Sequence, residues 1–155
     1  MTTTPERPLT VAVDDRLCLA LHAASRAMTA RYRPLLAELG LTYPQYLVMA
    51  VLWEDGAVGV RHLGDRLHLD SSTLSPLLTR LEGLGLVRRV REQRDGRAVR
   101  VELTVGGRAM AVAAAGIPGA ICDATGLELA RQQELVGVLR TLADELDPTR
   151  TVAYD

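Results

Sequence analysis

The sequence predicts a mainly α-helical chain with one small β-hairpin near its centre, and two adjacent patterns carry this prediction. Leucines recur at helical spacing over residues 69–84, which favours a helix with one apolar face. Gly85 follows at the position where a left-handed residue commonly ends a helix. Apolar residues then alternate on both sides of Asp95 and Gly96, a dipeptide typical of tight hairpin turns. A helix followed directly by such a hairpin is typical of a winged helix-turn-helix.

The helix over residues 70–84 has the features of a recognition helix. Asp70 or Ser71 is suited to cap it, because a short side-chain oxygen can accept an amide proton of the first turn. Its apolar face would hold Leu74, Leu77, Leu78, Leu81 and Leu84. The opposite side is rich in hydroxyl groups, which hydrogen-bond to base edges and phosphates. The residues predicted to contact DNA there are Ser71, Ser72, Thr73, Ser75, Pro76 and Arg80, and Thr79 lies on the same side.

Charge is uneven along the chain, although the net charge is only −1. Residues 86–100 hold six arginines against two acidic residues, whereas residues 120–155 hold three arginines against seven acidic residues. A locally basic surface indicates a polyanionic partner. A solvated hairpin would have the same charges, so it is the preceding helix that favours double-stranded DNA. The predicted DNA contacts of the hairpin are Arg94, Asp95 and Arg97.

Length and composition are those of one cored subunit. The chain has 155 residues, of which 48% are hydrophobic, enough for one domain or for a small domain with added dimerisation helices. No run of about 18 apolar residues occurs, and the N-terminus lacks the apolar centre of a signal peptide. We therefore expect a cytoplasmic protein that makes no contact with a membrane. No residue pattern predicts a cofactor or a bound metal.

The N-terminal part is predicted to be a flexible tail, residues 1–13, followed by a long helix. The helix should begin at Asp14 or Asp15, which can cap it, and end at Gly40 after roughly 25 residues. One side of it carries an unusual polar line whose members recur at steps of three and four residues. The line consists of Cys18, His22, Ser25, Thr29 and Tyr32.

Two further helices are predicted before the recognition helix. Thr42 and Gln45 form a capping box for a helix over about residues 44–53. Residues 54–59 should form a loop. Val60–Leu67 is then predicted as the first helix of the helix-turn-helix.

The helices after the hairpin are predicted to join two copies of the chain. Thr104 can cap a helix that residues 116–119 interrupt, and a last helix should cover about residues 127–146. Together with the N-terminal helix, these carry more apolar surface than a small domain can bury, which predicts a homodimer. The predicted single subunit spans residues 14–155, with dimerisation helices at 14–40 and 104–147 and the winged-helix part at 42–103.

The two cysteines, Cys18 and Cys122, are candidates for redox chemistry. Cys18 would lie in the first turn of its helix, where unpaired amides, the helix dipole and Arg16 favour a thiolate and two aspartates oppose it. A thiolate can attack a peroxide to give a sulfenic acid, which a second thiol captures as a disulfide. Alternatively, both cysteines fill apolar helix surfaces, and the tyrosines and His22 are ordinary packing or surface residues. The residues by themselves leave both interpretations open.

Residues 17–104 closely resemble the MarR family of bacterial winged-helix repressors, and within it the organic-hydroperoxide-sensing OhrR branch. Six motifs in order carry the resemblance. They are LCLALH at 17–22, YRPLLAELGLTYPQYLVMAVLWE at 32–54, LHLDSSTLSPLLTRLE at 67–82, Asp95-Gly96-Arg97, LT at 103–104 and IPG at 117–119.

The resemblance implies a peroxide sensor at Cys18, with Tyr32 and Tyr43 as pocket tyrosines that hydrogen-bond the cysteine of the opposite subunit. Helix geometry agrees, because the 14 residues from Cys18 to Tyr32 span about 21 Å and keep the two apart within one chain. In a two-cysteine subgroup the resolving cysteine follows the IPG-like kink, which matches Cys122 and implies an intersubunit disulfide. His22 stands where relatives carry a third tyrosine, so it is a candidate pocket donor.

From the resemblance we expect a homodimeric repressor that leaves operator DNA when an organic hydroperoxide oxidises Cys18 and a disulfide with Cys122 forms. One alternative is a MarR-type repressor released by a small phenolic or drug-like ligand, with Cys18 incidental. Another is a thiol peroxidase that uses both cysteines. The basic hairpin disfavours the peroxidase, so no enzymatic activity is predicted.

Overall fold

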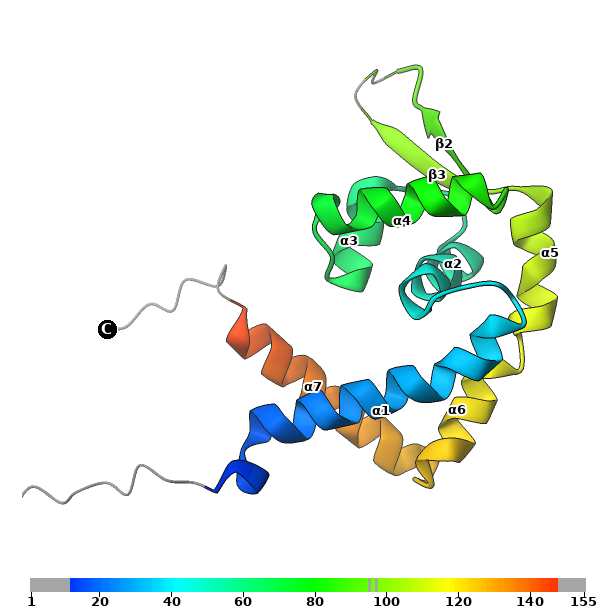
Figure 1. Cartoon of the computed structure of the whole chain (residues 1–155). Helices are drawn as coiled ribbons and strands as arrows, with labels where there is room; N and C mark the ends of the chain where they lie inside the picture. The colour runs from blue at the N-terminus through cyan, green and yellow to red at the C-terminus, as the bar shows by residue number, and fades with distance from the viewer. Residues whose placement is uncertain (1–11, 95, 97, 148–155) are drawn as a thin grey trace, which may run out of the picture. The chain divides into compact units, whose positions relative to one another are not determined.

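The computed structural model describes residues 12–94, 96 and 98–147, and the chain divides into two compact units between Ala115 and Gly116. Among the described residues, the first unit holds a short 3-10 helix, five α-helices and a three-stranded sheet, and the second holds two α-helices (Figure 1). The helices are α1 (Leu17–Ala37), α2 (Tyr43–Asp55), α3 (Val60–Leu67), α4 (Ser71–Gly83), α5 (Val105–Ala114), α6 (Ile117–Thr125) and α7 (Leu129–Leu146). The strands are β1 (Val58–Gly59), β2 (Val87–Arg91) and β3 (Val99–Leu103). The predicted mainly helical fold with a small β-structure is confirmed.

The start of α1 differs from the prediction. Asp14 and Asp15 do not cap it, because they lie in a 3-10 turn, η1 (Val13–Asp15), and Arg16 takes the N-cap position. The turn is held by its own backbone, with the Arg16 amide donating to the Val13 carbonyl at 3.1 Å, so neither carboxylate reaches the first amides of α1. Most of the predicted tail, residues 1–13, lies outside the described residues.

The C-terminal end of α1 lies close to Gly40, where the sequence predicted that the helix ends. Regular helix stops at Ala37, and Gly40 adopts a left-handed φ of +67° in the turn that follows. The Leu41 amide then donates back to the Leu36 carbonyl at 3.1 Å, which satisfies one of the last helical acceptors.

Helix α2 is central to the first unit, where it contacts α1, α3, α4 and α5. The predicted capping box is confirmed: the Gln45 amide donates to Thr42 Oγ1 at 3.5 Å, and the Thr42 amide donates to Gln45 Oε1 at 2.9 Å. Gln45 is only 5% exposed, and the bond from the Thr42 amide gives its buried side-chain oxygen a partner. The core side chains of α2 are Tyr46, Val48, Met49, Val51 and Leu52.

The helix-turn-helix is formed by α3 and α4. Asp70 caps α4, since its carboxylate accepts the Thr73 amide at 2.8 Å. The buried face of α4 holds Leu74, Leu78 and Leu81. Leu84 was expected on this face but is 53% exposed, because it follows the last helical residue. Gly85, at φ +70°, ends the helix as predicted.

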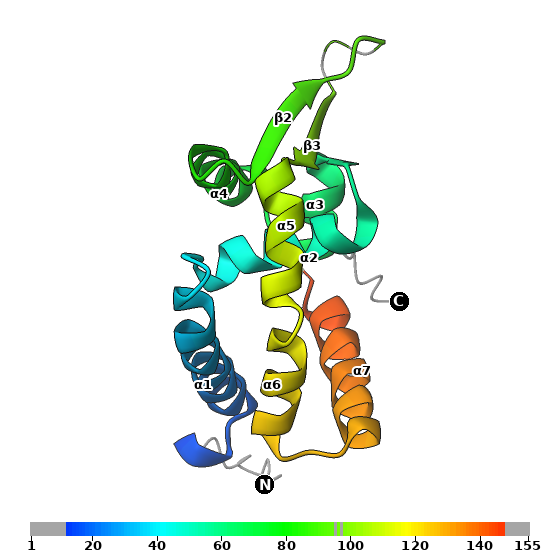
Figure 2. The same ribbon diagram turned by 90° about the vertical axis from the view of Figure 1, so that its right-hand side faces the viewer.

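Strands β2 and β3 pair antiparallel, with Val87 opposite Leu103, and project away from α4 to one side (Figures 1 and 2). Residues 54–59 are not all loop as expected. Val58 and Gly59 form a short strand that pairs with β3, which makes a sheet of order β1-β3-β2. Two residues are too few to show an alternating pattern, so the sequence held no signal for β1.

The stretch Val105–Thr125 is, by length and composition alone, apolar enough to cross a membrane. It is not one continuous helix, because α5 ends at Ala114 and α6 begins at Ile117. The predicted interruption over residues 116–119 is therefore confirmed at the break between the helices. Buried residues of the stretch are Gly107, Ala114, Ile117 and Ile121.

Candidate nucleic-acid interface and redox site

The outward face of α4 presents every residue predicted there. Ser71, Ser72, Thr73, Ser75, Pro76 and Arg80 are all exposed. Two hydroxyls on this helix are already engaged within the chain. Ser72 Oγ donates to the Asp70 carboxylate at 2.8 Å, and Thr79 Oγ1 donates to the Ser75 carbonyl at 3.1 Å. The Ser72 hydroxyl and the Thr73 amide hold the pKa of the Asp70 carboxyl below its ordinary value.

Several arginines of the hairpin are paired with acidic residues, which sequence reasoning missed. Arg88 pairs with Glu102 on the neighbouring strand. Arg100 pairs with Glu92 at 3.3 Å and also donates to the Ala57 carbonyl at 2.5 Å. These partners depend on strand register, which the charge count alone does not contain.

The distal hairpin is described only in part. Arg94 is exposed, as a phosphate contact requires. The other two predicted contacts, Asp95 and Arg97, lie outside the described residues.

The predicted pocket tyrosines come together at the junction of α1 and α2. The rings of Tyr32 and Tyr43 lie 4.6 Å apart between centroids, and Tyr46 lies 5.6 Å from Tyr32. Tyr46 in turn approaches Trp53 at 6.1 Å. Burial raises the pKa of Tyr43 above its ordinary value, so its phenol stays protonated and able to donate at neutral pH. Sequence reasoning missed the contact of Tyr46 with Tyr32.

Cys18 and His22 do not share this junction within one chain. Cys18 is a free, exposed thiol in the first turn of α1, as predicted, and His22 is exposed one turn later. At the rise of an α-helix, Cys18 is about 21 Å and His22 about 15 Å from Tyr32 along the axis.

Cys122 belongs to the second unit and lies near the end of α6. Its thiol is free and partly buried. Its backbone carbonyl accepts a hydrogen bond of 2.7 Å from Thr125 Oγ1 and a longer one of 3.4 Å from Gln132 Nε2. The second bond ties the end of α6 to α7. No cluster of three or more potential metal ligands occurs among the residues that the structure describes.

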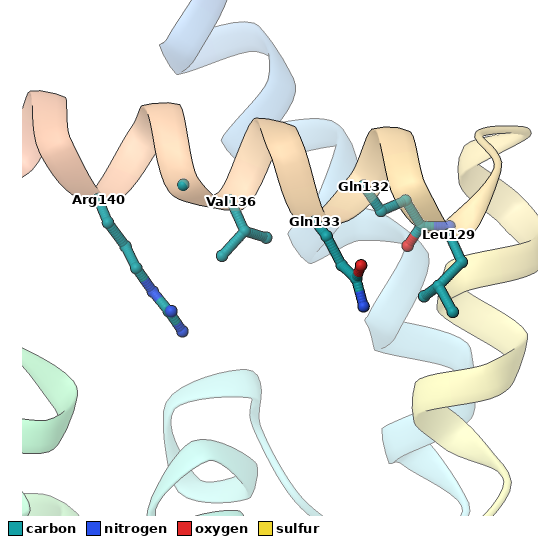
Figure 3. Close-up of a pocket in the computed structure, with 6 residues that line it drawn as sticks. Leu129, Gln132, Gln133, Val136 and Arg140 are labelled. Atoms are coloured by element: carbon teal, nitrogen blue, oxygen red, sulfur yellow. The ribbon is translucent and has the colours of Figure 1, made fainter.

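Helix α7 has no buried residue and carries an open hollow of about 420 Å³ along one side. Figure 3 shows Leu129, Gln133, Val136 and Arg140 projecting from the same side of the helix. Leu129 is 67% and Val136 44% exposed. This mixed apolar and polar side is uncovered within its own unit.

The helix-turn-helix and the paired strands behind it define a winged-helix regulator. A family model described as transcriptional regulator SarA/Rot matches residues 30–111. The chain is 45% identical over 134 residues to the HTH-type transcriptional regulator TtmR of Methylorubrum extorquens, an alignment that covers 86% of this chain and 69% of that protein. It is 40% identical over 134 residues to the organic hydroperoxide resistance transcriptional regulator of Bacillus subtilis, with 86% and 91% covered.

Solved structures agree with this assignment. Reduced AbfR bound to DNA has a TM-score of 0.74 at 33% identity, covering 86% of this chain and 95% of that chain. Disulfide-formed AbfR has a TM-score of 0.62 at 32% identity, covering 84% and 91%. AbfR is a protein of Staphylococcus epidermidis. The chain belongs to the MarR family of winged-helix transcriptional regulators and is of the MarR/OhrR type.

Proposed function

We propose that the chain is a cytoplasmic repressor that binds operator DNA as a homodimer and releases it when an organic hydroperoxide oxidises Cys18. One feature of α1 carries this proposal. Its first turn holds an exposed thiol, and the far part of the same helix holds Tyr32, packed against Tyr43. Because the helix separates thiol and phenols within one chain, a second copy would complete the sensor pocket. His22, exposed one turn after Cys18, would line the same pocket.

Exposed apolar side chains on α1 and α7 would provide the surface for that second copy. They are Leu17, Leu19, Met28, Leu129, Leu135, Val136, Val138, Leu139 and Leu146. Apolar surface gathered on helices in this way commonly marks a protein–protein interface. Residues 14–40 and 104–147 would accordingly be the dimerisation helices of one subunit, residues 14–155.

For DNA binding, we propose that α4 enters the major groove with its exposed face of Ser71, Ser72, Thr73, Ser75, Pro76 and Arg80. Arg94 would contact phosphate, and Arg97, braced by Asp95, would enter the adjacent minor groove. A two-fold dimer requires a pseudo-palindromic operator. Each arginine–phosphate contact releases counterions, so binding should weaken strongly as salt rises.

The proposed release step is an oxidation of two thiols. The Cys18 thiolate attacks one peroxide oxygen, the O–O bond breaks, and with one proton the products are a sulfenic acid and an alcohol. The thiol of the partner subunit's Cys122 then attacks the sulfenic sulfur, which forms a disulfide and releases water. A bond between α1 and the partner's α6 would strain the dimerisation helices and change the spacing of the two recognition helices.

The name of one relative and the redox states in which another has been solved support this chemistry. The Bacillus subtilis relative is an organic hydroperoxide resistance regulator. AbfR has been solved in reduced, overoxidised and disulfide-formed states, the first two bound to DNA.

The test is an operator-binding assay on wild type, Cys18→Ser and Cys122→Ser, with and without cumene hydroperoxide. Wild type should be released and should run as a covalent dimer on a non-reducing gel. Cys18→Ser should stay bound, and Cys122→Ser should form no covalent dimer. A mixture of the two variants should give heterodimers with a single intersubunit disulfide, which tests the pairing directly.

Each part of the proposal has its own contrary result. If peroxide releases Cys18→Ser from the operator, Cys18 is not the sensor. Full and reversible release of Cys122→Ser would favour a one-cysteine mechanism. Release of Cys18→Ser by a phenolic ligand would favour the ligand-gated alternative, and rapid turnover of peroxide with a thiol reductant would favour the peroxidase.

A further inference from the structure

Arg89 of β2 is directed back onto α4 and makes four hydrogen bonds with it. Its backbone amide donates to Glu82 Oε1 at 2.9 Å, and its Nε donates to Glu82 Oε2 at 2.9 Å. Its Nη2 donates to Glu82 Oε2 at 2.6 Å and to Thr79 Oγ1 at 3.1 Å. Thr79, Glu82 and Arg89 together are called the clasp below.

The clasp differs from the other ion pairs of the hairpin in what it joins. The pair of Arg88 with Glu102 joins β2 to β3, and the pair of Arg100 with Glu92 also lies within the hairpin. Among the described arginines of the hairpin, Arg89 alone has a side-chain hydrogen bond to the recognition helix, through Glu82 and Thr79. The Arg89 side chain is 32% exposed, and its charge is matched by the Glu82 side chain, which is 30% exposed.

The clasp also reaches the face of α4 that is proposed to meet DNA. The Thr79 hydroxyl accepts from Arg89 and donates to the Ser75 carbonyl at 3.1 Å, so both its donor and an acceptor site are used. The turn at Gly85 completes the connection, because the Leu86 amide donates to the Leu81 carbonyl at 3.0 Å. The base of β2 is therefore held to the end of α4 by backbone and side-chain bonds together.

We propose that the clasp sets the angle between the recognition helix α4 and the wing, which is the hairpin of β2 and β3. Arg89 is then a positioning residue for DNA binding and not a phosphate contact. The proposal rests on the DNA-binding function proposed above. The physical reason is that a small change of angle where β2 leaves α4 displaces the more distant residues of the hairpin by a larger distance. The five residues of β2, Val87–Arg91, extend about 16 Å, so a change of about 10° at Val87 moves Arg91 by about 3 Å, and the residues beyond it by more. A displacement of that size separates the wing from its groove while α4 is still seated.

A charge-matched pair of substitutions tests this assignment. Glu82→Ala and Glu102→Ala each remove one acidic group that pairs with an arginine of β2, but only the first breaks the clasp. The probe is a labelled duplex of about 30 base pairs, long enough for two half-sites, selected from random DNA by the wild-type protein. Affinity is measured by fluorescence anisotropy across a series of salt concentrations.

We expect Glu82→Ala to lose at least about tenfold in affinity at every salt concentration, with an unchanged slope of log affinity against log salt. Glu102→Ala should stay within about twofold of wild type or bind more tightly, since removal of a negative charge favours DNA. Arg89→Gln should resemble Glu82→Ala, and the double variant should be no weaker than either single one. Arg94→Gln, the phosphate-contact control, should reduce the slope by about one.

A smaller salt slope for Arg89→Gln, together with tighter binding by Glu82→Ala, would overturn the proposal and make Arg89 a phosphate contact. Thermal unfolding by circular dichroism identifies variants that fail to fold. Glu82→Gln, which keeps an acceptor for the Arg89 amide, then replaces Glu82→Ala and should show a smaller loss with the same slope. Equal affinity of Glu82→Gln and wild type would also overturn the proposal. Failure of the wild-type protein to select any duplex would instead refute the DNA-binding function itself.

Discussion

The indole Nε1 of Trp53 donates a hydrogen bond of 2.9 Å to the carbonyl oxygen of Gly107, which joins α2 to the first turn of α5. The close approach continues on the other side of Gly107. A β-carbon at this position would lie 2.0 Å from the Leu86 carbonyl oxygen, at the start of the wing. The first turn of α5 therefore packs against the hairpin base only because residue 107 has no side chain.

Gly107→Ala should destabilise the protein by about 3 kcal/mol or more, because the atom it would strike is backbone and cannot swing aside. Gly106→Ala is the matched control in the same turn. Its β-carbon would lie 3.5 Å from the Gly85 carbonyl oxygen, an ordinary contact, and alanine is the better helix former. Urea unfolding at neutral pH measures both variants. Equal stabilities would contradict the tight packing at Gly107.

Trp53→Phe should cost about 1 kcal/mol from the lost hydrogen bond, together with part of the ring contact with Tyr46. The wild-type indole reports on the same contact, because Trp53 is the single tryptophan of the chain. Its fluorescence should change when α5 separates from α2 on unfolding, at the denaturant concentration where circular dichroism changes. If the fluorescence of Trp53 changes at a much lower denaturant concentration than the circular dichroism, this contact is not part of the cooperative core.

Asp70→Asn should leave stability near neutral pH almost unchanged, because asparagine is as good an N-cap as aspartate. The two proteins should differ in acid. The folded-state pKa of Asp70 is lowered by its bonds from Ser72 and Thr73, so its stabilising effect is present above the ordinary aspartate pKa of about 4 and is lost as pH falls through the folded value. Denaturant unfolding from pH 7 to pH 3 should show a shallower decline for Asp70→Asn. Parallel declines would contradict this assignment.

Tyr43→Phe should slow the release of DNA by organic hydroperoxide about tenfold or more and leave the affinity of the reduced protein unchanged. The reason is the loss of one donor to a charged sulfur, a bond worth about 1.5–3 kcal/mol. Burial raises the pKa of Tyr43, so the phenol is protonated at neutral pH and the effect should persist up to alkaline conditions. Tyr46→Phe is the control, since Tyr46 is 6% exposed and packs toward Trp53. An equal slowing in both variants would point to general loosening of α2.

The sequence by itself determined those features that depend on a few adjacent residues. Three such features could be predicted: the capping pair of Thr42 and Gln45, the Asp70 cap and the terminating Gly85. Each depends on hydrogen bonds to backbone groups only three or four positions away in the sequence. The outward positions of α4 followed in the same way from helical periodicity. Even so, local reasoning placed a cap at Asp14 or Asp15, where a 3-10 turn forms instead.

Only the tertiary structure decided which distant residues meet. It brought Tyr32 to Tyr43 and Tyr46, paired the two residues of β1 with β3, and turned Arg89 from the basic hairpin onto Glu82. None of these contacts has a local signature, since each depends on the direction in which one element leaves another. The same basic stretch that indicated a polyanionic partner thus contains arginines that neutralise the protein's own carboxylates, and the sum of charges cannot distinguish the two uses.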